Sequence, residues 1–286
     1  MAEDSALTLL DRLAARARST LPPAWQRQVD ALRYDDAGHG YDPLGLHPGT
    51  IAAGASALRF LYERYFRVRS YGISNIPSDG PAILAANHSG ALPFDGAMIY
   101  FDVLRRSDPP RVLRPVMDHF VPGLPFVSTF FARVGAIAGS RGNVRYALEK
   151  GELLLIFPEG VDGIGKSFQQ RYQLQRWRVG HVELAIRYRA PVVPVAVIGA
   201  EEQMPQVGRI EGVHILGIPY VPVLLSPLPL PVRYHIYYGA AMDFSDRFSP
   251  ADADDPEKVA AAACEVKSAV AELVARGLRA REGIFR

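Results

Sequence analysis

Short apolar runs alternate with segments of helical pattern through the middle and the C-terminal part of the chain. Five runs have the length and apolar content of buried strands: 82–86, 112–116, 153–157, 192–198 and 232–238. Five longer segments are predicted helices: 96–105, 126–133, 141–150, 180–188 and 256–276. This alternation is typical of βαβ units, so it predicts an α/β fold with a mainly parallel central sheet flanked by helices. The last helix is expected to stop before Gly277, since glycine is favoured just past a helix end.

Ahead of this pattern, residues 1–65 predict an N-terminal helical region. Its first short helix carries apolar residues on one face: Leu7, Leu10 and Ala14. A second short helix follows around 25–32, and a longer one covers 50–66, with aromatic residues on one side and arginines on the other. Such an amphipathic helix suits a membrane interface and equally suits docking on its own domain, so both interpretations stay open.

Composition narrows the classes of function. The 286 residues are enough for one large domain with a substantial core. A net charge of +2 is too small to argue for nucleic acid as a partner. The single cysteine excludes an internal disulfide, and the first residues lack the apolar segment of a signal peptide, so a cytoplasmic location is expected. The seven histidines show no paired spacing, so no metal site is expected.

The most informative chemistry lies where the first predicted strand ends. His88 follows the apolar run 82–86, and Asp95 stands at the start of the next predicted helix. A carboxylate that accepts a hydrogen bond from one imidazole nitrogen leaves the other nitrogen able to take a proton from a hydroxyl. The pair therefore predicts a general base. The alternative interpretation makes Asp95 a helix cap and His88 a turn residue.

Three further segments follow in order along the chain. They are Gly135-Ala-Ile-Ala-Gly-Ser-Arg141, Phe157-Pro158-Glu159-Gly160, and the apolar stretch 190–196 that contains Pro194. Together with the His88 segment they resemble the four sequence blocks of the glycerolipid acyltransferases, the family that includes lysophosphatidate acyltransferase. The resemblance covers about residues 66–239, and it implies a single acyltransferase domain over 66–286 with the N-terminal helical extension 1–65.

The resemblance implies a function and a set of site residues. His88 and Asp95 would be catalytic, and the residues that match the family's substrate-binding blocks are Asn87, Gly135, Arg141, Phe157, Pro158, Glu159, Gly160 and Pro194. The expected reaction moves a fatty acyl group from acyl-CoA or acyl carrier protein to a hydroxyl of a glycerolipid such as lysophosphatidate. His88 would deprotonate the acceptor itself, so no covalent enzyme intermediate, cofactor or metal is expected.

The chain departs from the family pattern at two places. The family usually has four residues between the His and the Asp, whereas here six separate His88 from Asp95. The pair forms only if the intervening segment loops out, for which Gly90 and Pro93 are suitable residues. The family also commonly has Thr-Arg after Glu-Gly, whereas here Val161-Asp162 follow. Residues 178–202 look more like the branch with neutral acceptors such as diacylglycerol, so the acceptor stays open.

Charged residues near these blocks carry further expectations. Arg141 stands where the family holds the acceptor's phosphate, so the resemblance implies that role for it. The alternative is a surface arginine that opens a helix, but a cation there opposes the helix dipole, so an anionic partner is expected. Glu159 is expected to accept from acceptor hydroxyls or from Arg141. Four basic residues are candidates to replace the missing Arg: Lys166, Arg171, Arg176 and Arg178.

Two features bear on a membrane. The uncharged stretch 212–232 is interrupted by five prolines, so it is not expected to be a transmembrane helix. It is interpreted as an extended apolar loop that lines an acyl channel or touches the membrane, or as core. Two groups of arginines suit anionic lipid headgroups or are ordinary solvated faces. They are Arg59, Arg64, Arg67 and Arg69, and Arg105, Arg106, Arg111 and Arg114. A peripheral contact with the membrane is expected, and no oligomeric state is predicted.

Two other functions compete with the acyltransferase. The segment 138–142 is one residue away from the Gly-x-Ser-x-Gly elbow of lipases and esterases, with Ser140 as nucleophile. That enzyme would need His181, His214 or His235 as its base. A non-catalytic lipid-binding protein is the third hypothesis, and the displaced Asp95 is the feature in its favour.

Overall fold

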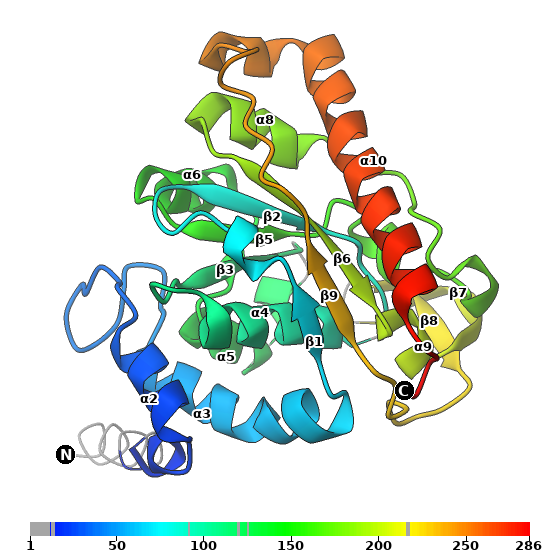
Figure 1. The fold of residues 1–286 in the computed structure, drawn as a ribbon, viewed down its shortest axis with the longest axis horizontal. Coiled ribbons are helices and arrows are strands. Elements are labelled where there is room, and N and C mark those ends of the chain that lie inside the picture. The colour runs from blue at the N-terminus through cyan, green and yellow to red at the C-terminus, as the bar shows by residue number, and fades with distance from the viewer. Residues whose placement is uncertain (1–11, 13–14, 91, 119–120, 125, 216–217) are drawn as a thin grey trace.

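The computed structural model describes residues 12, 15–90, 92–118, 121–124, 126–215 and 218–286. A seven-stranded sheet forms the centre, helices cover both of its faces, and a separate two-stranded ribbon stands beside it (Figure 1). This arrangement confirms the predicted α/β fold with its mainly parallel sheet.

The sheet has the strand order β1-β9-β6-β2-β5-β3-β4. Its strands are β1 (Arg69–Tyr71), β2 (Ala82–Ala86), β3 (Leu113–Met117), β4 (Ile137–Ala138), β5 (Leu153–Ile156), β6 (Val192–Ile198) and β9 (His235–Tyr238). All neighbours are parallel except β6 and β9, which pair antiparallel. The strands β2, β5 and β3 therefore end at the same edge of the sheet.

Alternate residues of the central strands enter two separate cores. Leu84 of β2 packs in the core beneath α2 (Pro23–Asp30), α3 (Pro48–Phe60) and α4 (Phe94–Arg106), and Ile83 packs in the opposite core. That second core lies beneath α6 (Arg141–Glu149), α8 (Gly180–Tyr188) and α10 (Pro256–Ala280). The remaining helical segments are short: α5 (Val127–Arg133), α7 (Val161–Ile164), α9 (Ala200–Gln203), the π-helical turn Leu61–Tyr65, and 3₁₀ turns at Ile73–Asn75, Val121–Gly123, Phe168–Gln170 and Pro250–Asp254.

Most predicted elements appear within a few residues of their expected bounds, and β2, β6 and α8 match them fully. The prediction for the last helix was wrong at its end, because α10 continues through Gly277 to Ala280. A Cβ at Gly277 would lie 2.1 Å from Ile198 Cδ1 and 2.6 Å from Tyr237 Cε2. Glycine is used here for a close approach of the helix to the sheet, not for a helix end.

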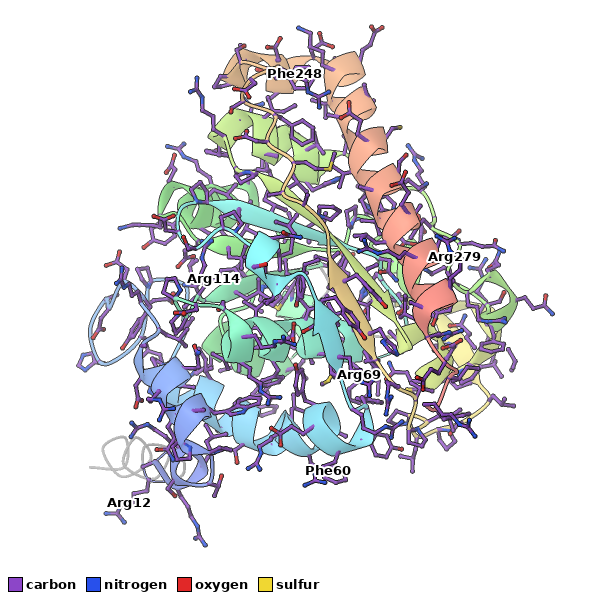
Figure 2. All side chains as sticks on the ribbon, in the orientation of Figure 1. Arg12, Phe60, Arg69, Arg114, Phe248 and Arg279 are labelled. Carbon is purple, nitrogen blue, oxygen red and sulfur yellow. The ribbon has the colours of Figure 1, made fainter. Side chains whose placement is uncertain are left out.

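The described part of the N-terminal region packs against the sheet. Trp25 and Val29 of α2 and Ile51 of α3 are buried in the same core as Leu84. Phe60, at the end of α3, points outward and is 62% exposed (Figure 2). The helix predicted around Leu7, Leu10 and Ala14 lies outside the described residues, and the domain boundary at residue 65 stays a prediction.

The proline-rich stretch 212–232 takes part in a ribbon instead of forming only a loop. Strands β7 (Gln206–Ile215) and β8 (Ile218–Leu224) pair antiparallel, and Arg209 faces Pro222 across the pair. A two-stranded ribbon has two edges, where a proline without an N–H donor is tolerated. Among the described residues, no helix has the length and apolar character needed to cross a membrane.

Two of the arginines expected to suit lipid headgroups lie inside the fold, so that interpretation was wrong for them. Arg114 of β3 (labelled in Figure 2) is fully buried and forms ion pairs with Asp42 and Glu152. The guanidinium of Arg111 donates to backbone carbonyls, including those of Pro77 and Gly80. These contacts supply the pairing that a buried cation requires.

Replacing Gly277 tests the close packing of α10 on the sheet. Gly277→Ala should lower the free energy of unfolding by about 1–3 kcal/mol, because the new methyl group would overlap Ile198 and Tyr237. The matched control is Gly142→Ala in α6, where a Cβ meets nothing within 4 Å and the higher helix propensity should raise stability by up to about 1 kcal/mol. Urea denaturation measures both, and equal stabilisation by the two substitutions would contradict the packing described here.

His181 should make the protein acid-sensitive. Burial lowers the pKa of His181 to about 4, whereas an unfolded histidine titrates near 6.5. The unfolded chain then binds the proton more tightly, so stability is present above pH ~6.5 and is lost towards pH ~4, by up to about 3 kcal/mol.

The comparison with His181→Gln isolates this effect from other acid-sensitive groups. The difference in unfolding free energy between wild type and His181→Gln should shrink as the pH falls from 7 to 4, as measured by urea titrations. His39→Asn is the control, because His39 is exposed and has a φ of 58° that asparagine tolerates. A wild-type difference from His181→Gln that is independent of pH would contradict the assignment.

Candidate active site

The sheet brings two of the predicted blocks together. β2 and β5 are parallel neighbours, with Ala85 opposite Ile156. The residues that follow them, His88 and Glu159, therefore leave the sheet at the same edge, and the backbone N–H of His88 donates to Glu159 Oε1 at 3.2 Å. The carboxyl ends of parallel strands are where α/β sheets commonly place their sites.

Asn87 fixes the chain immediately before His88. Its side chain is fully buried, Nδ2 donates to the Val197 carbonyl at 3.0 Å, and Oδ1 accepts from the Val197 N–H at 2.7 Å. The side-chain amide of Asn87 thus replaces a pair of backbone hydrogen bonds between β2 and β6. These bonds commit both ends of the Asn87 amide to the sheet, and its contact with substrate stays a prediction.

The structure brings Asp95 to His88 across the longer loop. Asp95 Oδ2 lies 2.6 Å from His88 Nδ1 and also accepts from the Ser89 N–H at 2.9 Å, while Oδ1 accepts from the Gly96 N–H at 2.7 Å. Gly90 turns the chain with a φ of +87°, a left-handed conformation that glycine adopts without steric cost. Asp95 is fully buried in the first turn of α4, where the helix dipole stabilises a negative charge.

An aromatic ring packs against the face of the imidazole. Phe157 stacks on His88 with ring centroids 4.1 Å apart and an interplanar angle of 23°. A Cβ at Gly96 would lie 3.4 Å from the Phe157 ring, so the start of α4 backs that ring closely. The His88 side chain keeps 17% of its surface exposed, whereas Asp95 has none. With Nδ1 on Asp95, Nε2 is the nitrogen available to a substrate.

Glu159 is completely buried, and the protein itself supplies its described partners. Oε1 accepts from the His88 N–H, and Oε2 accepts from the Gln175 N–H at 2.9 Å and lies 3.3 Å from Lys166 Nζ. Lys166 also donates to Glu201 Oε1 at 2.9 Å. Direct contact of Glu159 with an acceptor hydroxyl or with Arg141 stays a prediction, and the structure gives this carboxylate an internal set of bonds.

Gly163 is a site residue that the sequence did not single out. A Cβ at this position would lie 2.8 Å from Glu159 Cβ and 2.9 Å from His88 Cβ, so only glycine fits between the two side chains. The sequence signal that could have identified it is a second glycine three residues after Gly160. At Gly160 the φ is +53°, and a Cβ would lie 3.1 Å from Arg178 Cζ, so this guanidinium covers the turn after Glu159.

The other predicted substrate-binding residues lie apart from this cluster or serve the backbone. The Pro158 carbonyl accepts from the Arg178 N–H, and Pro194 is buried within β6. Gly135 turns the chain before β4 with a φ of +97°. Arg141 does open α6 as predicted, is exposed, and together with Arg187, the larger cause, holds the pKa of Asp254 below its usual range. No described contact joins Arg141 to His88 or Glu159.

The geometry around Ser140 does not resemble a lipase elbow. Ser140 has ordinary extended backbone angles, caps α6 and accepts from the Asn143 N–H at 3.3 Å. His181 instead contacts the Arg178 carbonyl, and His235 stacks on Tyr71. Among the side chains that the structure describes, which exclude that of His214, no histidine contacts Ser140.

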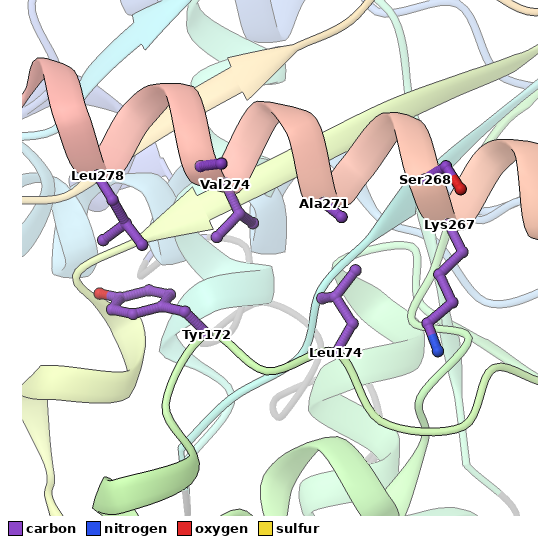
Figure 3. A pocket seen from close by; sticks show the side chains of 8 residues that line it. Tyr172, Leu174, Lys267, Ser268, Ala271, Val274 and Leu278 are labelled. Carbon is purple, nitrogen blue, oxygen red and sulfur yellow. The ribbon is translucent and has the colours of Figure 1, made fainter.

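A surface groove of about 350 Å³ lies between α10 and the loop that contains Tyr172 and Leu174 (Figure 3). Tyr172 and Leu174 line it from the loop, facing Ala271, Val274 and Leu278 of α10. The predicted site residues are not among its lining residues. Among the described residues, no group of three or more potential ligands is placed to hold a metal ion.

Comparison with known proteins agrees with the fold and the sequence blocks. A family model described as Acyltransferase matches residues 67–198. The crystal structure of PlsC, the 1-acyl-sn-glycerophosphate acyltransferase of Thermotoga maritima, is similar with a TM-score of 0.52 at 18% identity, over 82% of this chain and 83% of that one. This likeness supports the shared fold.

Two groups of sequence relatives extend the comparison. Uncharacterized protein Rv0502 of Mycobacterium tuberculosis is 36% identical over 238 residues, which are 80% of this chain and 66% of that protein. The Gallus gallus protein named "DGAT1/2-independent enzyme synthesizing storage lipids" is 29% identical over 69% of this chain and 60% of its own length. The chain thus spans slightly less than two thirds of these relatives. With its sequence blocks, its fold and these matches, the chain belongs to the glycerolipid acyltransferase family.

Proposed function

We propose that this protein transfers a fatty acyl group from acyl-CoA or acyl carrier protein to a hydroxyl of a glycerolipid, with His88 as the general base. The observation that carries the proposal is the 2.6 Å contact between Asp95 Oδ2 and His88 Nδ1, made from a fully buried carboxylate. A buried carboxylate beside Nδ1 favours the tautomer with the proton on that nitrogen, and this tautomer leaves a lone pair on Nε2 for the acceptor hydroxyl.

The reaction then follows from this tautomer. As the acceptor oxygen attacks the thioester carbonyl, Nε2 takes the hydroxyl proton, and a tetrahedral intermediate forms. The intermediate collapses to the new ester, and the departing thiolate takes the proton back from the imidazolium. Asp95 stabilises the transient imidazolium, and its bonds to the Ser89 and Gly96 N–H groups keep the carboxylate fixed during both steps.

Residues after Glu159 favour a neutral acceptor. Where the family commonly has Thr-Arg, this chain has Val161-Asp162, and Asp162 is exposed in the first turn of α7. A carboxylate at this position would repel a phosphate that an arginine would attract. The Gallus gallus relative is named for storage-lipid synthesis, which fits monoacylglycerol or diacylglycerol as acceptor. Lysophosphatidate is the alternative to be tested beside them.

Such substrates reside in membranes, so we propose that the enzyme works at a membrane surface from the cytoplasmic side. Exposed apolar side chains after β8 suit this contact, since Leu225 and Leu228 are 70% and 72% exposed. They follow the ribbon of β7 and β8, whose Gln206 borders a small cavity beside Ser89 and Gly90 in the His88 loop.

Removing the base should lower turnover strongly while leaving the fold intact. His88→Ala and Asp95→Asn should each lower kcat by about 10²–10⁴-fold, because the first removes the proton acceptor and the second disturbs its tautomer. His39→Asn is the matched control, since His39 is exposed on a loop before α3. Initial rates with a thioester donor measure the effect, and full activity in His88→Ala would exclude the mechanism.

The choice of acceptor is measured with purified protein, liposomes and a radiolabelled palmitoyl donor, supplied in parallel reactions as palmitoyl-CoA and as palmitoyl-acyl carrier protein. Lysophosphatidate, a lysophospholipid, monoacylglycerol and diacylglycerol are supplied separately, and the products are separated by thin-layer chromatography. We expect label in a neutral acylglycerol, formed about 10²–10⁴-fold more slowly in the His88→Ala reaction. Label only in phosphatidate would contradict the neutral acceptor, and no transfer with either acyl-CoA or acyl carrier protein would contradict the function itself.

A further inference from the structure

Lys166 lies at the centre of a buried cluster that supports the proposed base. Its Nζ is 3.3 Å from Glu159 Oε2 and 2.9 Å from Glu201 Oε1. The three side chains are exposed by only 3%, 0% and 5%. One ammonium group therefore stands between two carboxylates from different parts of the chain, and all three groups are buried.

The two carboxylates in turn hold backbone. Glu159 Oε1 accepts from the N–H of His88 and Oε2 from that of Gln175, while Glu201 Oε2 accepts from the Tyr172 N–H at 2.7 Å. Through them Lys166 is connected to the end of β2, to the loop that contains Tyr172 and Gln175, and to α9. The bond to His88 is the one that matters for chemistry, since the imidazole projects from that residue.

We propose that Lys166 is a positioning residue for His88, because its ammonium group pairs with the buried Glu159 carboxylate and keeps it in place as the acceptor for the His88 N–H. This inference rests on the proposed acyl transfer and names a residue that acts on its base through another side chain. A carboxylate without any exposed surface is costly unless it is paired. Without Lys166, two buried carboxylates would face each other and one would take up a proton.

The other charged groups around the cluster have partners of their own or stand in solvent. Asp95 is bound to His88, and Glu202 of α9 is held by Arg281. Arg178 covers Gly160, but its side chain is 63% exposed and lies 3.9 Å from Asp118. Burial raises the pKa of Tyr172 well above its usual value, so this phenol stays neutral. Among the described residues, Lys166 is the cation that contacts Glu159.

Loss of this cation has a signature in the pH profile. In the wild type, the acid limb of kcat reports protonation of the base. In Lys166→Met, the pair of Glu159 and Glu201 would hold a proton up to a higher pH, so the bond to His88 weakens in that range. In the wild type, burial raises the pKa of Glu201 and Lys166 opposes that rise. Removal of Lys166 should therefore raise this pKa further.

The experiment compares pH profiles of kcat and KM for purified full-length variants whose folding is checked by thermal unfolding. Lys166→Met should lose about 10²-fold in kcat at pH 7, recover part of it as the pH rises, and keep KM near the wild-type value. Lys166→Arg retains the charge and should retain the wild-type acid limb. In Lys166→Met/Glu159→Gln the displaced limb should disappear, because the titrating group is gone. Lys150→Met, on the exposed turn after α6, is the control.

Two results would overturn the inference. One is a Lys166→Met protein with the wild-type profile, and the other is a loss of kcat that is equal at every pH. If Lys166→Met does not fold, Glu159→Gln gives the test, since it should lower kcat at least tenfold with no displaced limb, and wild-type turnover would overturn the proposal. His88→Ala, measured in parallel, distinguishes a failure of the proposed function from a failure of the role given to Lys166. An active His88→Ala enzyme contradicts the proposed function, whereas with an inactive one the role of Lys166 is decided by the Lys166 and Glu159 variants.

Discussion

The arrangement of the site depends on one buried carboxylate. Asp95 has no surface in contact with solvent, yet its Oδ2 lies 2.6 Å from His88 Nδ1 and the carboxylate accepts from the N–H groups of Ser89 and Gly96. A buried charge is tolerated only with such bonds, and here the same bonds hold the imidazole and the turn that carries it. The two requirements, charge compensation and orientation of the imidazole, are met by the same three contacts.

A second layer of bonds fixes the backbone under the imidazole. Asn87 extends the ladder between β2 and β6 up to the residue before His88, and Glu159 holds the His88 N–H. Gly163 allows Glu159 and His88 to approach, since a Cβ there would lie within 3 Å of both. His88 is thus placed by strand ends and by buried polar side chains.

Much of this could be predicted from local sequence. Continuous apolar runs identified β2, β5 and β6, and the positions of His88 and Asp95 at a strand end and a helix start indicated their pairing, which Gly90 permits. The remainder depends on partners distant in sequence. Asn87 bonds a residue 110 positions away, and Glu159 meets His88 from 71 positions away, so their internal roles have no local signal. Gly277 and the two-residue strand β4 likewise follow from tertiary packing, which overrides propensity at those places.

The claim that Asp95 sets the tautomer of His88 is tested most directly by nitrogen NMR of protein labelled at the histidine ring nitrogens. At neutral pH we expect a protonated Nδ1 and an unprotonated Nε2 at His88, and a change of that pattern in Asp95→Asn. His88→Gln assigns the signals. A protonated Nε2 in the wild type, or a spectrum of His88 that Asp95→Asn leaves unchanged, would contradict this role of Asp95.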